Sequence, residues 1–122
     1  MLTMGSVVLG VADVPRAVAF WTAALGYVPR GEFDEDWAVL LPPHEGGVQL
    51  ALDRSVSPVQ EHPRIHLDLY ADDAAEQAAE VERLVALGAE RVDWDSYPPD
   101  PDFVVLADPD GNRFCVIDTA HG

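Results

Sequence analysis

The chain has very little cysteine and few basic residues. Cys115 is the only cysteine among 122 residues, so neither an internal disulfide nor a cysteine-rich zinc site can form. Lysine and arginine together number 7 against 22 aspartates and glutamates, which gives a formal net charge of -15. Such a charge repels phosphate backbones and anionic lipids, so we expect neither nucleic acid nor a membrane as a partner.

Long hydrophobic runs are also missing. No apolar segment approaches the roughly 20 residues that span a bilayer. The start, M-L-T-M-G-S, lacks the basic flank and the apolar run of a signal peptide, so we predict a cytoplasmic protein. Hydrophobic residues still make up 48% of the chain, which is enough for a core, and the length fits a single domain over residues 1–122.

An internal repeat dominates what the sequence does contain. The segment S-V-V-L-G-V-A-D, which starts at Ser6, aligns without a gap with H-L-D-L-Y-A-D-D, which starts at His66. Downstream of each segment a helical pattern ends in A-L-G, at Gly26 and Gly88, and glycine is the usual left-handed stop of a helix. The pattern predicts one βαβββ unit that is used twice.

The predicted fold class is therefore α+β. Asp13 and Asp73 are suitable N-caps for the two helices. Each helix covers one face of its own sheet, so the other face needs a partner. Pairing the two modules would give a curved, half-open mixed β-barrel whose concave interior is the natural ligand site. We predict strands over 6–12, 27–30, 37–41, 48–52, 66–70, 90–94, 103–107 and 114–117, in modules that span about 4–53 and 64–119.

The opening strand of module two carries an unusual polar face. Residues 64–73, R-I-H-L-D-L-Y-A-D-D, alternate between apolar and polar side chains. Burial of the isoleucine and leucines leaves His66, Asp68 and Tyr70 together on the opposite side of the strand. An imidazole, a carboxylate and a phenol in this arrangement suit a metal, a ligand or solvent.

Two motifs carry a resemblance to a known family. The opening V-V-L-G-V-A-D-V-P-R-A-V-A-F-W-T-A-A-L-G-Y resembles the first module of the vicinal oxygen chelate superfamily. The ending D-P-D-G-N-R-F-C-V-I-D resembles the last hairpin of its glyoxalase and bleomycin-resistance branches. The likeness covers essentially the whole chain and implies the fold of that superfamily. It implies much less about chemistry, because this fold hosts many functions.

The resemblance also implies where a metal would bind. Metal-dependent members place ligands on the first and last strands of each module, and these positions fall on Ser6, Gln49, His66 and Cys115. Hard divalent metals prefer carboxylates and imidazoles, and a hydroxyl and an amide complete a zinc site poorly. We expect Asp68 to orient His66 rather than to bind an ion. No cofactor is therefore expected, and a divalent metal is disfavoured.

His66 and Cys115 have other conceivable roles. His66 is either a pocket-wall residue that hydrogen-bonds Asp68 or Tyr70, or an acid–base group, since histidine titrates near neutrality. Cys115 lies in the apolar strand F-C-V-I, where a buried cysteine usually behaves as a small hydrophobe. A reactive thiolate would need a neighbouring cation, which only His66 is expected to supply.

Aromatic residues indicate the kind of ligand. A concave sheet that is rimmed by aromatic side chains suits a flat or hydrophobic small molecule. The loop S-Y-P-P-D-P-D at 96–102 is rich in carboxylates, which favours a cationic or polar-aromatic ligand over an anionic one. The predicted pocket comprises Ser6, Gln49, His66, Asp68, Tyr70, Trp37, Trp94, Tyr97, Phe103 and Cys115, with Tyr70 further in than the other aromatics.

The function that we predict is metal-independent binding of a small organic molecule by a sequestering or resistance-type protein, as a homodimer. The main alternative is a glyoxalase-like enzyme, which would be a lyase, an isomerase or a dioxygenase. In that enzyme His66 would act as a base or metal ligand, and Gln49 would polarise a substrate oxygen. A third possibility is a regulatory or interaction subunit that binds no ligand.

Overall fold

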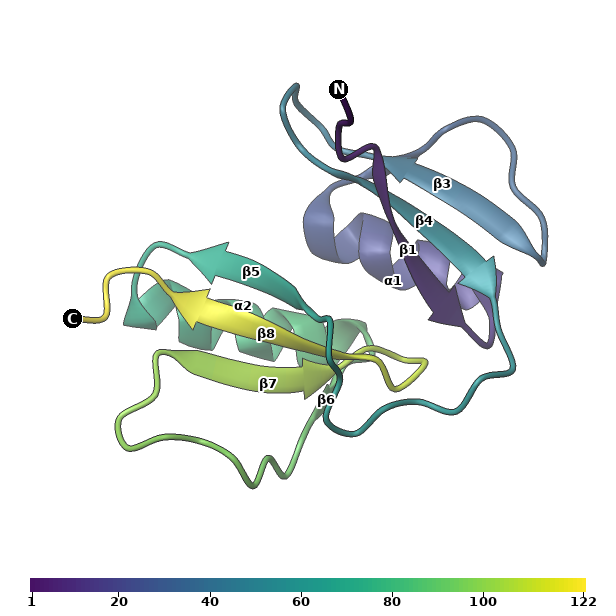
Figure 1. The fold of residues 1–122 in the computed structure, drawn as a ribbon. Helices are drawn as coiled ribbons and strands as arrows, with labels where there is room; N and C mark the ends of the chain where they lie inside the picture. The colour runs from purple at the N-terminus through teal and green to yellow at the C-terminus, as the bar shows by residue number, and fades with distance from the viewer. The chain divides into compact units, whose positions relative to one another are not determined.

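The computed structural model describes residues 1–122, which form eight strands and two helices (Figure 1). The chain divides into two compact units, Met1–Pro58 and Val59–Gly122, and each unit contains one of the predicted modules. The α+β class and the duplicated βαβββ order are confirmed. Neither helix is long and apolar enough to cross a membrane.

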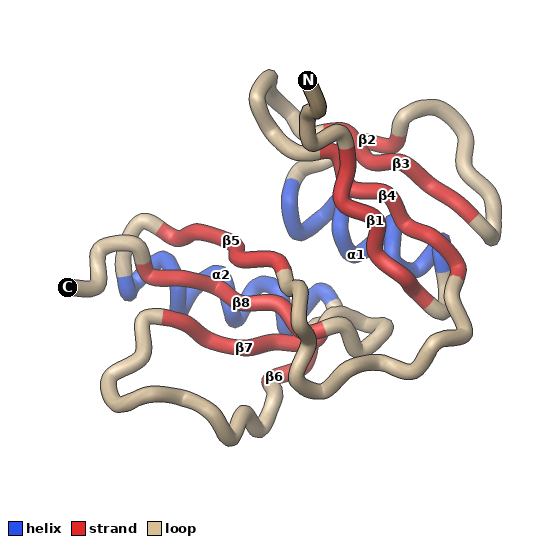
Figure 2. The backbone as a smooth tube through the Cα atoms, in the orientation of Figure 1, coloured by secondary structure: helices blue, strands red, loops and turns tan.

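Module one is a four-stranded mixed sheet with one helix against it (Figure 2). The strand order is β1-β4-β3-β2, so the first strand pairs in parallel with the last strand of the module. In chain order its elements are β1 (Ser6–Val11), α1 (Val14–Leu25), β2 (Val28–Pro29), β3 (Trp37–Leu41) and β4 (Gln49–Arg54).

Module two repeats this arrangement with the order β5-β8-β7-β6. The parallel pair β5–β8 again joins the first and last strands, and its register places Asp68 opposite Cys115. The elements are β5 (Leu67–Ala71), α2 (Ala74–Leu87), β6 (Glu90–Arg91), β7 (Phe103–Ala107) and β8 (Arg113–Asp118).

Side-chain caps and glycines define the helix ends as predicted. The Asp13 carboxylate accepts a backbone N–H of the first turn of α1 at 3.1 Å, and Gly26 ends that helix with a left-handed φ of 70°. Asp73 accepts the N–H of Glu76 at 2.8 Å. The Glu76 carboxylate in turn accepts the N–H of Asp72 at 3.4 Å, one residue before the cap.

Each module contains its own hydrophobic core. In module one Phe20 and the fully buried Trp21 pack edge to face, with ring centroids 5.0 Å apart. In module two Phe114 is the largest fully buried side chain. The Gln77 amide on α2 also donates to the Val116 carbonyl at 2.9 Å, so a hydrogen bond joins this helix to the sheet.

The edge strands β2 and β6 are shorter than the predicted ranges 27–30 and 90–94. Pro29 has no N–H to donate, which limits pairing along β2. Beyond β6 the ladder continues only weakly, because the Val92 N–H lies 3.4 Å from the Val105 carbonyl.

The D-P-D-G-N turn between β7 and β8 is organised by a buried carboxylate. Asp108 is 2% exposed, and its Oδ1 accepts the backbone N–H groups of Asp110 at 2.9 Å and Asn112 at 2.8 Å. The Asp108 N–H donates to the Asn112 carbonyl at 2.9 Å, which closes the turn. This turn sets where β8 begins and therefore positions Cys115 along the sheet.

Asp108→Ala should lower the free energy of unfolding by about 3 kcal/mol, because two backbone N–H groups lose charge-assisted hydrogen bonds in a buried site. Urea denaturation followed by circular dichroism measures this change. Asp93→Ala is the matched control, since Asp93 is exposed, and it should change stability by less than about 0.5 kcal/mol. Equal effects of the two substitutions would contradict the role given to the turn.

Candidate functional site

Module two contains a cavity of about 540 Å³. Much of its wall comes from alternate residues of three strands, because side chains two positions apart share a sheet face. This volume lies within the range of pockets that hold small organic molecules. The lining residues are Asp68 and Tyr70 from β5, Phe103 and Val105 from β7, Arg113, Cys115 and Ile117 from β8, and Pro63, His66, Trp94, Ser96 and Asp102 from the flanking segments.

His66, Asp68 and Cys115 come together in this wall. His66 Nδ1 lies 2.9 Å from Asp68 Oδ1, and the two side chains are 42% and 43% exposed. The β5–β8 register places Asp68 beside Cys115, which is 7% exposed. One possible ligand atom from each residue lies within 4.8 Å of the other two. The expectation that Asp68 contacts His66 is therefore met, and the thiol is a further neighbour.

The Cys115 thiol is not activated in this setting. Burial, together with the negative charge and the hydrogen bond of Asp68, raises the pKa of Cys115 from 9.0 to about 11. A protonated thiol is a poor nucleophile. His66 was expected to be the only nearby cation, but burial is the main cause of the raised pKa of the thiol, and the adjacent Asp68 carboxylate raises it further. Cys115 accordingly resembles a structural cysteine more than a catalytic one.

The donor set of these three residues suits some metals and not others. Ca²⁺ and Mg²⁺ prefer a shell of oxygens, and a single carboxylate supplies too few of them. Zn²⁺ accepts an imidazole nitrogen, a carboxylate oxygen and a thiolate sulfur. Ligand bonds of about 2.0–2.3 Å in a tetrahedral zinc site imply donor separations of about 3.3–3.8 Å. The three donors lie within 4.8 Å of one another, so the widest separation exceeds this range by about 1–1.5 Å, whereas His66 Nδ1 and Asp68 Oδ1, at 2.9 Å, would have to move slightly apart.

Three further predicted pocket residues lie in module one. Ser6 and Gln49 are directly paired across β1 and β4, so their side chains share one face of that sheet. Trp37 begins β3 and is partnered with Asp53, further along β4. These residues do not line the module-two cavity. A catalytic role for His66 with Gln49 stays a prediction.

The strand registers show that Gln49 and Cys115 are not equivalent positions. Gln49 pairs with Ser6, the first residue of β1, whereas Cys115 pairs with Asp68, two residues beyond the Ser6 counterpart His66. Continuing the β5–β8 register by one residue makes Arg113 the counterpart of Gln49. The motif resemblance located Cys115 correctly on β8 but did not reveal this offset.

Arg113 is a lining residue that sequence reasoning missed. It lies two positions before Cys115, so the alternation of β8 alone would have placed it on the same face. Its Nη1 donates to the Gly111 carbonyl at 2.9 Å, while its Nε is buried without a hydrogen-bond partner. The cavity wall therefore combines a guanidinium with the carboxylates of Asp68 and Asp102.

The predicted aromatic residues of module two divide into two groups. Trp94, Phe103 and Tyr70 line the cavity, although Tyr70 is 77% exposed and not deep inside. Tyr97 does not line it. Its ring packs on Phe103 with centroids 5.2 Å apart, and its hydroxyl accepts the Val105 N–H at 2.7 Å. Tyr97 thus supports the wall without forming it.

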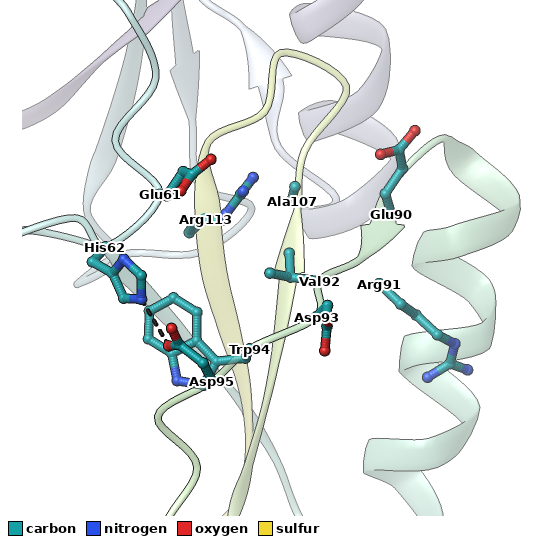
Figure 3. A pocket seen from close by; sticks show the side chains of 10 residues that line it. All are labelled: Glu61, His62, Glu90, Arg91, Val92, Asp93, Trp94, Asp95, Ala107 and Arg113. Carbon is teal, nitrogen blue, oxygen red and sulfur yellow. Dashed lines mark hydrogen bonds and ion pairs between the residues drawn. The ribbon is translucent and has the colours of Figure 1, made fainter.

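Figure 3 shows the residues that line a second cavity, of about 310 Å³. Trp94 and Arg113 line both cavities. His62 packs on Trp94 with ring centroids 4.8 Å apart, and its Nε2 lies 2.8 Å from Asp95 Oδ1. The hydrogen bond with His62, followed by that with Ser96, holds the pKa of Asp95 below its usual value. This histidine–carboxylate pair resembles His66–Asp68 but has no thiol beside it.

Residues 6–117 match the glyoxalase-like domain family. The chain belongs to this family. The resemblance to the vicinal oxygen chelate superfamily, on its glyoxalase and bleomycin-resistance side, is thereby confirmed. No curated protein matches this glyoxalase-like chain.

Solved structures share the fold of this glyoxalase-like protein at low sequence identity. A glyoxalase-related enzyme from Fulvimarina pelagi is 21% identical with a TM-score of 0.70, over 96% of this chain and 88% of that one. A lactoylglutathione lyase from Agrobacterium tumefaciens is 22% identical with a TM-score of 0.64, over 98% and 95%. The fosfomycin resistance protein FosX from Listeria monocytogenes is 17% identical with a TM-score of 0.70, over 98% and 94%.

In metal-free protein, Cys115 should react slowly with iodoacetamide. A pKa of about 11 leaves roughly one thiol in a thousand ionised at pH 8, and the rate should rise as the pH approaches that pKa. Asp68→Asn removes a negative charge that raises the pKa, so its rate profile should move to lower pH. Mass spectrometry of protein alkylated with a chelator present measures both profiles. Asp100→Asn, outside the cavity, is the control, and an unchanged Asp68→Asn profile would refute the contribution assigned to the Asp68 charge.

Proposed function

We propose that this glyoxalase-like protein binds a small, partly aromatic organic molecule in the module-two cavity. The observation that supports the proposal most directly is the composition of the cavity wall. Trp94, Phe103 and Tyr70 offer ring faces, while Val105 and Ile117 add aliphatic surface around a few polar groups. Binding sites for small molecules usually combine a mostly apolar wall with a small number of placed polar groups.

The charges in the wall select among such ligands. The wall contains two carboxylates, Asp68 and Asp102, and one guanidinium, Arg113. The net charge of -15 on the whole chain also draws cations toward the protein. An aromatic ammonium or a neutral aromatic is therefore favoured over an aromatic carboxylate, as the acidic 96–102 loop had indicated.

A sequestering or resistance-type role accords with this site. Binding without turnover needs no activated nucleophile, and in the metal-free protein the raised pKa keeps the Cys115 thiol protonated. Proteins that share this fold include one named as a fosfomycin resistance protein and one named as a lactoylglutathione lyase. Identity of the natural ligand, an enzymatic activity and the homodimer stay predictions.

Three phenyl compounds that differ mainly in charge test the proposal: phenethylamine, phenethyl alcohol and hydrocinnamate. In chelator-treated Trp37→Phe protein, titration should change Trp94 emission, because Trp21 is buried in module one. The ammonium should bind about tenfold more tightly than the carboxylate, which corresponds to about 1.4 kcal/mol. Phe103→Ala should weaken the binding of all three compounds, since each loses a contact with the Phe103 ring.

Asp102→Asn separates charge selection from general binding. The substitution should reduce the difference in affinity between phenethylamine and hydrocinnamate, because one carboxylate of the cavity wall becomes neutral. Asp100→Asn makes the same chemical change outside the cavity and should leave the difference intact. The proposal fails if none of the three compounds alters Trp94 emission or the melting temperature, or if hydrocinnamate binds best.

A further inference from the structure

We propose that His66, Asp68 and Cys115 form a binding site for a thiophilic divalent cation, with Zn²⁺ as the expected ion. Their ligand atoms lie within 4.8 Å of one another, and all three residues line the cavity of module two. The ligand set differs from the one that the motif resemblance implies, because it includes Asp68 and takes nothing from module one. Such an ion is additional to the proposed ligand binding and does not depend on it.

The three donors lie on, or directly beside, paired strands of one sheet. Asp68 and Cys115 are direct partners in the parallel β5–β8 pair, and His66 immediately precedes β5. The buried Asp108 carboxylate holds the turn from which β8 starts. Sites whose ligands stand on regular elements hold their geometry better than sites on loops. Three protein donors also leave a fourth position of a tetrahedral ion for water or a ligand in the cavity.

Charge and donor softness select the ion. The expectation of no metal rested on a set without a carboxylate, which leaves a dication poorly neutralised. Asp68 supplies that carboxylate, and Cys115 would supply the second negative charge once a bound ion displaces the thiol proton. The sulfur and the imidazole favour zinc over magnesium, calcium and manganese, which prefer oxygen ligands.

A second histidine–carboxylate pair in the same module provides an internal comparison. His62 and Asp95 approach to 2.8 Å, much as His66 and Asp68 do, but they are 56% and 72% exposed and no cysteine lies with them. If an imidazole–carboxylate contact alone sufficed, both pairs would bind zinc. The thiol is what distinguishes the proposed site.

The experiment uses the full chain, purified without a metal-affinity tag and freed of metal with a chelator that is then removed. Zinc is titrated in competition with a chromophoric chelator, and Co²⁺ is added separately as a spectroscopic substitute. We expect one tightly bound zinc per chain, and a cobalt complex with a thiolate charge-transfer band in the near ultraviolet. That band requires direct bonding of sulfur to the ion.

Variants assign the ligands. Cys115→Ser should abolish the charge-transfer band and lower the zinc affinity at least about a hundredfold. His66→Ala and Asp68→Asn should each lower the zinc affinity about tenfold or more. His62→Ala and Asp95→Asn should retain one zinc of unchanged affinity. Circular dichroism checks that every variant is folded, and the cobalt spectrum of the unaltered chain remains decisive if one is not.

Three results would overturn the site: no stoichiometric zinc, a zinc affinity that Cys115→Ser leaves unchanged, or cobalt that binds without the thiolate band. The phenyl-compound titrations are run on metal-free protein, so the two proposals can fail separately. If phenethylamine binds and zinc does not, only the proposed metal site is refuted. If zinc binds and none of the phenyl compounds does, only the proposed function is refuted.

Discussion

The parallel pairing of β5 with β8 is the constraint on which the site depends. A shift of one residue in a strand register turns every side chain to the opposite face of the sheet. The observed register keeps Asp68 beside Cys115, and it keeps Arg113 and Ile117 on the same wall. The D-P-D-G-N turn with its Asp108 hydrogen bonds precedes β8, and the Asp73 cap opens α2 directly after β5.

Most of the architecture could be predicted because its signals are local. Asp13 and Asp73 cap their helices through side-chain hydrogen bonds to nearby N–H groups, and Gly26 supplies the left-handed stop of α1. These features involve residues that are close in sequence. Because the same features occur in both halves of the chain, they indicate that the module is duplicated. The edge strands were predicted too long because their ends depend on pairing with a neighbour, as at Pro29.

The site could be predicted only in part, because it depends on contacts between distant segments. Alternation along 64–73 placed His66 and Asp68 on one face, as observed. The approach of Asp68 to Cys115 follows from the register of two strands that are far apart in sequence, and no local pattern encodes it. The motif resemblance marks only Cys115 on β8, whereas strand alternation from Cys115 places Arg113, two residues earlier, on the same face.

The contact between Tyr97 and β7 has a consequence for association between chains. Beyond the short β6, the outer backbone groups of Val105 are occupied, since its N–H donates to the Tyr97 hydroxyl at 2.7 Å and its carbonyl faces the Val92 N–H at 3.4 Å. Unoccupied groups on a sheet edge recruit strands from other molecules. The Tyr97 hydroxyl and the two residues of β6 therefore cover this edge of β7 and protect it against edge-to-edge aggregation.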